Sequence, residues 1–161
     1  MKRIFVLLTV SIFLVANFCF SQEKEQTNKQ AVENEITKLA YEIFTYESNG
    51  DAESARKYYD WADYDNEPGG NFKKIYRFAF TQEMKTIAQR NWLKAKYNAL
   101  KKAYGDAGIP HQAENYVITD IQINDALDDV TVIYEHPIAK EGVRFHSKDG
   151  KWLIYRDFLV K

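Results

Sequence analysis

The chain of 161 residues is rich in apolar and aromatic side chains (45% and 15%), carries 22 basic against 23 acidic residues, and has a single cysteine. This composition excludes a disordered chain and a disulfide-stabilised fold, and the balanced charge excludes a nucleic-acid-binding protein, which needs an excess of positive charge to meet phosphates. The length suits one domain of the commonest size.

Residues 1–21 have the features of a secretory signal peptide. Lys2 and Arg3 come before an apolar stretch over residues 4–15, and the small residue Ser21 precedes a predicted cleavage site. Removal of this segment leaves 140 residues without cysteine, and the loss of two basic side chains makes the net charge −3. We therefore expect a periplasmic or secreted protein whose stability comes from packing of its aromatic residues.

The cysteine of the leader is not expected to carry a lipid. A bacterial lipoprotein has a small residue immediately before its acylated cysteine, whereas Asn17 and Phe18 precede Cys19 here. Cys19 is therefore interpreted as the small residue at position −3 of the cleavage site. Beyond residue 21 no apolar run reaches the roughly 20 residues of a membrane-spanning helix, so we expect no transmembrane segment after cleavage.

A polar leader and a first helix follow the signal. Residues 22–30 are wholly polar and predict a frayed leader, and residues 31–161 contain no linker and predict one domain. Apolar residues then recur at a helical period at Val32, Ile36, Leu39, Ala40, Ile43 and Phe44. Thr27 and Gln30 match a capping box, and Gly50 marks the end of the helix.

A short second helix is predicted next, with Asp51 as its N-cap. Its apolar positions are Ala52, Ala55, Tyr58 and Tyr59. The pattern fades in the acidic, glycine-bearing residues 63–71. Residues 72–80 fit a strand and a helical turn equally well, and both alternatives stay open.

Thr81 begins a strong helix that ends near Gly105. Its apolar positions advance by three or four at Met84, Ala88, Trp92, Ala95, Ala99 and Ala103. The small residues predict that another element approaches closely, so we expect this helix to lie across a sheet. Its basic residues, which we interpret as the solvent side of the helix, are Lys85, Arg90, Lys94, Lys96, Lys101 and Lys102. An acidic partner or an anionic membrane surface is the alternative for them.

Four strands are predicted after Pro110, where β-branched and aromatic residues alternate with polar ones. Their inward-facing residues are predicted as Val117, Thr119, Ile121 and Ile123 in the first strand, Val130, Val132 and Tyr134 in the second, and Val143 and Phe145 in the third. Asp149-Gly150 carries a hairpin signal that leads into a final strand over residues 152–160. The fold class is therefore α+β, with N-terminal helices packed on one face of a C-terminal curved antiparallel sheet of about four strands.

Two short segments carry a family resemblance when they are combined with this order of elements. They are the helix junction Asn49-Gly50-Asp51-Ala52 and the hairpin Lys148-Asp149-Gly150-Lys151-Trp152-Leu153-Ile154. Over roughly residues 30–161 the chain resembles the NTF2-like (cystatin-like) superfamily, especially its small exported bacterial members of unknown function. The resemblance implies a cone in which a curved sheet wraps helices around a pocket. The chain departs from the fuller pattern between Asp63 and Phe80, where members with an extra hairpin have two strands.

The final strand offers the best candidates for chemistry. Strict alternation places Trp152, Ile154, Arg156 and Phe158 on one side and Leu153, Tyr155, Asp157 and Leu159 on the other, unless a bulge intervenes. An inward Asp157 beside Tyr155 would allow an acid–base role, whereas an inward Arg156 would favour an anionic ligand or a buried ion pair. The simpler interpretation has both charges solvated or paired where the strand leaves the core.

Aromatic residues and one arginine predict the walls of a ligand pocket. The candidates are Trp61, Trp92, Tyr134, Trp152, Tyr155 and Arg156. The ordinary interpretation of aromatic residues at helix and strand spacing is that they form the core.

The three histidines give no metal-binding pattern. His111, His136 and His146 lack the i, i+4 spacing of a helical metal pair, and we interpret them as surface or strand-end residues. His146 remains, with Asp157, a weak candidate for a general base. We predict neither a metal site nor a cofactor.

An acidic group near residues 60–70 is interpreted as a solvated loop. Its members are Asp60, Asp63, Asp65 and Glu67. A calcium-binding loop starting at Asp63 would need glycine where Pro68 stands and a bidentate glutamate where Lys74 stands.

Two classes of function remain. The first, which we favour, is an exported, non-catalytic domain that binds a small apolar ligand in its cone or another envelope protein on its sheet, and unpaired sheet edges predict a homodimer. The second is an enzyme of the isomerase or dehydratase kind that uses Asp157 or a histidine as general base. A purely structural envelope component would show neither a pocket nor a perturbed side chain.

Overall fold

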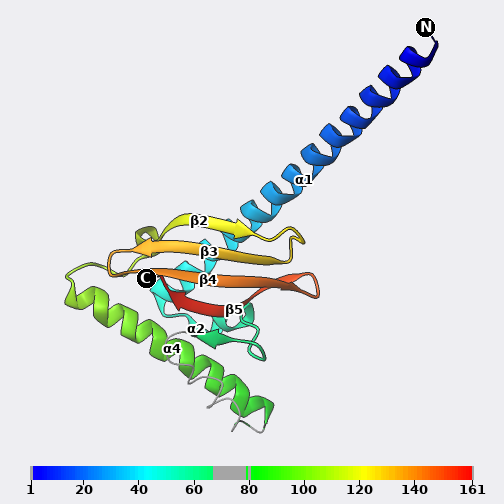
Figure 1. Cartoon of the computed structure of the whole chain (residues 1–161). Coiled ribbons are helices and arrows are strands. Elements are labelled where there is room, and N and C mark those ends of the chain that lie inside the picture. The colour runs from blue at the N-terminus through cyan, green and yellow to red at the C-terminus, as the bar shows by residue number, and fades with distance from the viewer. Residues whose placement is uncertain (1, 67–78, 80, 161) are drawn as a thin grey trace. The chain divides into compact units, whose positions relative to one another are not determined.

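The computed structural model describes residues 2–66, 79 and 81–160, and the side chains of residues 26–64, 79 and 81–160 (Figure 1). The chain forms two compact units, Met1–Glu35 and Ile36–Lys161. Helix α1 (Lys2–Asn49) makes up the described part of the first unit. Because this helix is continuous through residues 22–30, the predicted helix start at the Thr27 capping box is wrong. Within the described residues, none of the helices is long and apolar enough to cross a membrane.

The part of α1 that belongs to the second unit buries the predicted apolar stripe. The buried residues are Ile36, Ala40, Ile43 and Phe44, each no more than 5% exposed. Glu47 lies on the same stripe, eleven residues after Ile36, and is only 3% exposed. Gly50 ends the helix in the left-handed region at φ +71°, as its lack of a Cβ permits.

A short helical segment connects α1 to the edge of the sheet. The Asp51 carboxylate accepts a hydrogen bond from the Ser54 backbone N–H (3.0 Å) and caps α2 (Ala52–Ala55), which continues as the 3-10 helix η1 (Arg56–Tyr58). The predicted helix is thus shorter than expected, because Tyr59 is already extended. Strand β1 (Asp65–Asn66) follows, and the ambiguous segment lies outside the described residues except for Ala79.

Helix α4 (Gln82–Asp106) begins where it was predicted, because the Thr81 hydroxyl accepts a hydrogen bond from the Met84 backbone N–H (3.1 Å). Its buried face is not the predicted one and consists of Gln89, Leu93, Tyr97 and Tyr104. Met84 is 44% exposed, and Ala95 and Ala99 are exposed as well. Burial of a large side chain removes far more apolar area from water than burial of an alanine, so leucine and the tyrosines decide which face turns inward.

Four long antiparallel strands complete the fold. They are β2 (Val117–Ile123), which follows the 3-10 helix η2 (Ala113–Asn115), then β3 (Asp129–His136), β4 (Ala139–Lys148) and β5 (Lys151–Leu159). The sheet order is β1-β5-β4-β3-β2, and only the short β1 runs parallel to its neighbour (Figure 1). Asp149 and Gly150 adopt φ 52° and 71° and confirm the predicted hairpin. The α+β class, with helices packed against an antiparallel sheet, is confirmed.

Two bulges change which side chains face the helices. In β2 the register shifts between Ile118 and Asp120, so Val117 lies on the outer face and is 55% exposed, contrary to prediction. In β5 the shift lets Arg144 pair with Arg156 and Phe145 pair with Ile154, which leaves Tyr155 as the extra residue. The second bulge places Arg156 on the outer face and brings Asp157, which pairs with the buried Val143, onto the inner face.

Candidate functional site

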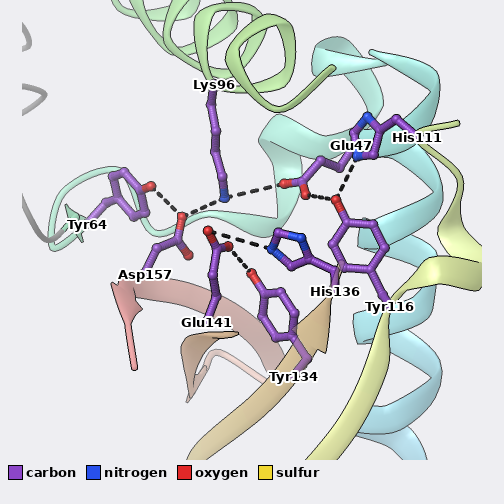
Figure 2. A network of polar contacts seen from close by, with 9 residues as sticks. All are labelled: Glu47, Tyr64, Lys96, His111, Tyr116, Tyr134, His136, Glu141 and Asp157. Atoms are coloured by element: carbon purple, nitrogen blue, oxygen red, sulfur yellow. Dashed lines mark hydrogen bonds and ion pairs between the residues drawn. The ribbon is translucent and has the colours of Figure 1, made fainter. Parts of the chain in front are cut away.

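Nine polar side chains form a network in the second unit (Figure 2). They come from α1, α4, the sheet and the connecting segments. They are Glu47, Tyr64, Lys96, His111, Tyr116, Tyr134, His136, Glu141 and Asp157. Two of its three carboxylates, Glu47 and Asp157, form ion pairs with one ammonium group, Lys96, whose charge also acts on the third, Glu141. The network therefore has more negative than positive charge when its histidines are neutral.

Lys96 lies between two of the carboxylates and points away from the axis of α4 (Figure 2). Its Nζ is 2.9 Å from Asp157 Oδ2 and 3.4 Å from Glu47 Oε2. The Tyr64 hydroxyl donates a second hydrogen bond to Asp157 Oδ2 (2.8 Å). The prediction that Lys96 belongs to the solvent side of the helix is wrong, because its side chain is only 22% exposed.

Glu47 connects this ion pair to a histidine in the loop before β2. Its Oε1 accepts a hydrogen bond from the Tyr116 hydroxyl (2.5 Å), and the same hydroxyl oxygen is 2.7 Å from His111 Nε2. Since the Tyr116 proton is used toward Glu47, the geometry favours a His111 tautomer that donates from Nε2. Burial lowers the pKa of His111, which favours its neutral form.

Glu141 is the third carboxylate and has a different environment. The Tyr134 hydroxyl donates to Glu141 Oε2 (2.8 Å), and His136 Nε2 lies 3.8 Å from Oε1, which is too long for a hydrogen bond. The His136 side chain is 0% exposed and stacks among tyrosines, with neither ring nitrogen hydrogen-bonded to a described residue. His136 ends β3, as predicted for a strand-end residue, but it is buried rather than at the surface.

The electrostatics of the network follow from burial and charge. Burial by itself lowers the pKa of Lys96, but the charges of Asp157 and Glu47 outweigh it and raise this pKa well above the ordinary value. Burial raises the pKa of Glu141, yet His136, the Lys96 charge and the Tyr134 hydroxyl together bring it below the ordinary value. Burial and the neighbouring Glu47 carboxylate raise the pKa of Tyr116. At neutral pH the network thus holds Lys96 and Glu141 in their charged forms.

A pocket of about 270 Å³ opens beside the ion pair. It is lined by Tyr64, Trp92, Ala95, Lys96, Glu141, Asp157, Phe158 and Leu159. Deeper between α1 and the sheet, the space next to Phe44 and Tyr134 amounts to only about 10 Å³. The interior of the cone is therefore filled by side chains, and the open volume lies where Trp92 faces the charged groups.

Asp157 and Trp92 are thus the sequence candidates that the fold brings to the pocket, while Tyr134 lies behind it and reaches the site through Glu141. Tyr155 and Arg156 lie on the opposite face of the sheet because of the bulge in β5. The expected side-by-side arrangement of Tyr155 and Asp157 is wrong for that reason.

The other predicted pocket residues lie away from this pocket. Trp61 stacks on Tyr59 with ring centroids 5.0 Å apart and donates from Nε1 to the Arg56 carbonyl (2.7 Å). Trp152 pairs with Ser147 near the hairpin at the far end of β5. Neither tryptophan is among the residues that line the pocket.

His146 and part of the acidic group form a separate cluster. Asp60 Oδ2 is 2.6 Å from Lys148 Nζ and 2.9 Å from His146 Nε2. Because Asp60 is only 6% exposed, its interpretation as part of a solvated loop is wrong, although the Asp63 side chain is 64% exposed. Glu67 lies outside the described residues. In the part of the chain that the structure describes, no three His, Cys, Asp or Glu side chains are grouped as metal ligands.

Sequence reasoning missed most of the network, although two of its members left a signal. Glu47 falls on the apolar stripe of α1, where a carboxylate needs a partner. Lys96 falls on the stripe of α4 that Leu93, Tyr97 and Tyr104 define, and only the choice of the alanine stripe hid it. Glu141 and His136 left no such signal, because their approach depends on the pairing of β3 with β4.

Comparisons with known proteins bear on the fold. No protein-family model matches the chain, and no curated protein matches it either. The chain is similar to the crystal structure of an NTF-2 like protein of unknown function from Shewanella oneidensis MR-1, with a TM-score of 0.44 and 13% sequence identity over 78% of this chain and 96% of that chain. A likeness of this degree carries nothing about activity, and the α+β arrangement stands on the strand pairing of this chain.

Proposed function

We propose that this protein binds a small, largely apolar molecule in the pocket beside Lys96. Binding would take place in the periplasm or outside the cell, where the predicted signal peptide directs the chain. The observation that carries the proposal is the pocket of about 270 Å³, in which the apolar side chains of Trp92 and Leu159 lie beside charged groups. Ligand sites commonly combine mainly apolar walls with a few fixed polar groups.

The polar end of the pocket is held rigidly, which favours selective binding. Lys96 and Tyr64 both donate to Asp157 Oδ2, so the carboxylate is fixed in one orientation before any ligand arrives. A site whose groups are already ordered loses less conformational entropy on binding. The pocket volume matches a molecule with about one aromatic ring rather than a peptide or a long lipid chain.

The fluorescence of Trp92 tests this proposal directly. In a variant with Trp61→Phe and Trp152→Phe, Trp92 is the remaining tryptophan, and its fluorescence reports occupancy of the pocket. We expect a saturable fluorescence change on titration with small aromatic probes such as indole, at micromolar to millimolar concentrations. A flat titration across a panel of such probes would sink the proposal.

A pair of variants on one helix gives a matched control. Ala95 lines the pocket and is exposed, so Ala95→Phe should fill the pocket and reduce binding at least tenfold. Ala99 is also exposed, lies one turn further along α4 and does not line the pocket, so Ala99→Phe should bind as the parent does. Equal effects of the two substitutions would mean that the signal comes from elsewhere.

A second candidate function, catalysis by proton transfer, is supported by the position of Asp157. This carboxylate lines the pocket and is 15% exposed, and no described residue donates to its Oδ1, so this oxygen is available to a substrate. A general base must reach the proton that it removes from a bound substrate. The candidate ranks second because Lys96 and Tyr64, the neighbours that would complete acid–base chemistry, both already donate to Oδ2.

Hydrogen exchange tests this second candidate. Small apolar ketones are incubated with the protein in D2O, and deuterium incorporation next to the carbonyl is followed by NMR. Catalysis predicts exchange that Asp157→Asn abolishes and that Asp129→Asn, on the outer face of the sheet, leaves unchanged. Exchange that persists in Asp157→Asn, or no exchange with any ketone, rejects the assignment.

A further inference from the structure

The charges around the pocket are unequal, and this inequality bears on the kind of ligand. Glu141 and Asp157 line the pocket with carboxylates, and Lys96 supplies the ammonium. That ammonium also contacts Glu47 at 3.4 Å, so one positive charge serves carboxylates on two sides. Among the described residues, no lysine or arginine lies within 4 Å of the Glu141 carboxylate. The imidazole of His136, at 3.8 Å, is the basic group that lies within this distance.

The Tyr64 and Tyr134 hydroxyls already donate hydrogen bonds to carboxylates, whereas acceptor oxygens of these carboxylates remain. The Tyr64 hydroxyl donates to Asp157 Oδ2, and the Tyr134 hydroxyl donates to Glu141 Oε2. In the described part of the chain, Asp157 Oδ1 receives no hydrogen bond, and His136 Nε2 is 3.8 Å from Glu141 Oε1, too far for a hydrogen bond. A ligand with a donor is therefore accommodated more easily than one with an acceptor.

The excess of negative charge around the pocket likewise favours a ligand that donates hydrogen bonds and carries a positive charge. An anionic group in the pocket would approach two carboxylates, with only an ammonium that is already paired twice to offset the repulsion. A cationic group would instead complete a set of charges that is short of one positive partner. The indole of Trp92 adds a favourable surface, since tryptophan is the strongest aromatic partner for a cation.

We propose that the pocket is selective for small amphiphilic cations, of the arylalkylammonium class, whose ammonium group lies between Asp157 Oδ1 and Glu141 while the apolar part packs against Trp92 and Leu159. This inference rests on the proposed binding function and specifies its ligand. It also assigns to Glu141 a role in specificity, separate from the ion pair of Lys96.

Three probes of nearly equal size and different charge test the inference on the Trp92 reporter variant. They are 2-phenylethylammonium, 2-phenylethanol and phenylacetate. We expect the ammonium to bind at least tenfold more tightly than the alcohol, and phenylacetate to bind most weakly. The preference should shrink as the salt concentration rises, because it is electrostatic.

A matched pair of carboxylate variants assigns the preference to its residue. Glu141→Gln should reduce the affinity for the ammonium about tenfold and leave that for the alcohol unchanged. Glu135→Gln removes an exposed carboxylate of the neighbouring strand, on the other face of the sheet, and should change neither affinity. If Glu141→Gln weakens all three probes equally, a general loss of structure is responsible and the assignment of Glu141 is overturned.

The outcomes separate this inference from the function on which it rests. If the alcohol or phenylacetate binds as tightly as the ammonium, and Ala95→Phe abolishes that binding, the pocket binds ligands but the cation selectivity is wrong. If none of the three probes binds, both proposals fall.

Discussion

The two faces of the sheet carry the same set of groups in different surroundings. On the inner face Lys96, Asp157 and Tyr64 form a cation, carboxylate and phenol triad. On the outer face Arg144 Nη2 is 2.9 Å from Asp129 Oδ1, and the Tyr155 hydroxyl donates to Asp129 Oδ2 (2.6 Å). The outer pair is 37% and 28% exposed, compared with 22% and 15% for the inner pair.

The difference between the two triads shows that burial, rather than the identity of the groups, decides their effect. Burial and the Asp157 charge raise the pKa of Tyr64 well above its ordinary value. Burial and the hydrogen bond to Asp129 raise the pKa of Tyr155 only to about 12. In addition the inner triad adjoins Glu47, which is 3% exposed, and a pocket, whereas water can solvate the outer one.

The strongest contrast is expected from removal of each cation. Lys96→Met leaves Glu47 and Asp157 buried without their positive partner and should lower the free energy of unfolding by about 3–5 kcal/mol. Arg144→Met, the matched change on the outer face, should cost about 0.2–1 kcal/mol. Urea denaturation followed by circular dichroism measures both. Equal losses in the two variants would contradict the comparison.

A neutral replacement of the whole inner ion cluster checks the cause of that loss. In the triple variant Lys96→Met, Glu47→Gln and Asp157→Asn, no carboxylate of the cluster is left without its cation. We expect the triple variant to be more stable than Lys96→Met alone, because unpaired buried charge is costlier than its absence. A triple variant less stable than the single one would assign the loss to packing instead.

The tyrosines give the next largest contrast. Tyr64→Phe removes a hydrogen bond to a buried carboxylate and should cost about 1.5–3 kcal/mol, as is usual for a hydrogen bond to a charged group. Tyr155→Phe removes the corresponding bond on the outer face, where water can replace it, and should cost less than about 1 kcal/mol. The urea midpoints of the two variants decide between these values, and the reverse order would refute the role of burial.

Gly142 offers a smaller effect, which comes from packing on the outer face of the sheet. A Cβ at position 142 would overlap the ring of Phe158, which is paired with this glycine across β4 and β5. Gly142→Ala should therefore displace the ring and cost about 1 kcal/mol, at the low end for overpacking because Phe158 is only partly buried. Since the Phe158 ring covers Gly142 on the face opposite Asp157, the affinity for the aromatic probes should change little. A clear loss of affinity would show that this ring takes part in binding.

The pH dependence of stability is the subtlest difference. The pKa of Glu141 is lowered from its ordinary value of 4.5 in the folded chain, so its stabilising contribution is complete above pH 4.5 and is lost as the pH falls through the folded value. Urea unfolding of the parent and of Glu141→Gln, measured between pH 7 and pH 3, should show a shallower acid loss in the variant. Parallel curves would mean that Glu141 does not contribute to acid sensitivity.

Local sequence patterns predicted some features of the fold correctly and others wrongly. The stripe of α1, the caps Asp51 and Thr81, and the Asp149-Gly150 hairpin were predictable, because each depends on residues within one or two turns of chain. The buried face of α4 was predicted wrongly, since alanines were given the same weight as leucine and tyrosine. The side of the sheet that Asp157 faces was not predictable, because one bulge residue reverses the alternation in β5.

The sequence by itself determined the order of helices and strands, the balance of charge and the absence of cysteine beyond the predicted signal, since these follow from composition and local periodicity. The tertiary structure decided that side chains fill the space between α1 and the sheet, that a pocket opens beside the ion pair, and that carboxylates from α1 and β5 share the ammonium of Lys96. The reason is physical: Glu47, Lys96 and Asp157 are tens of residues apart, and only helix packing and strand register bring their charges within a few ångströms in a place that water hardly reaches.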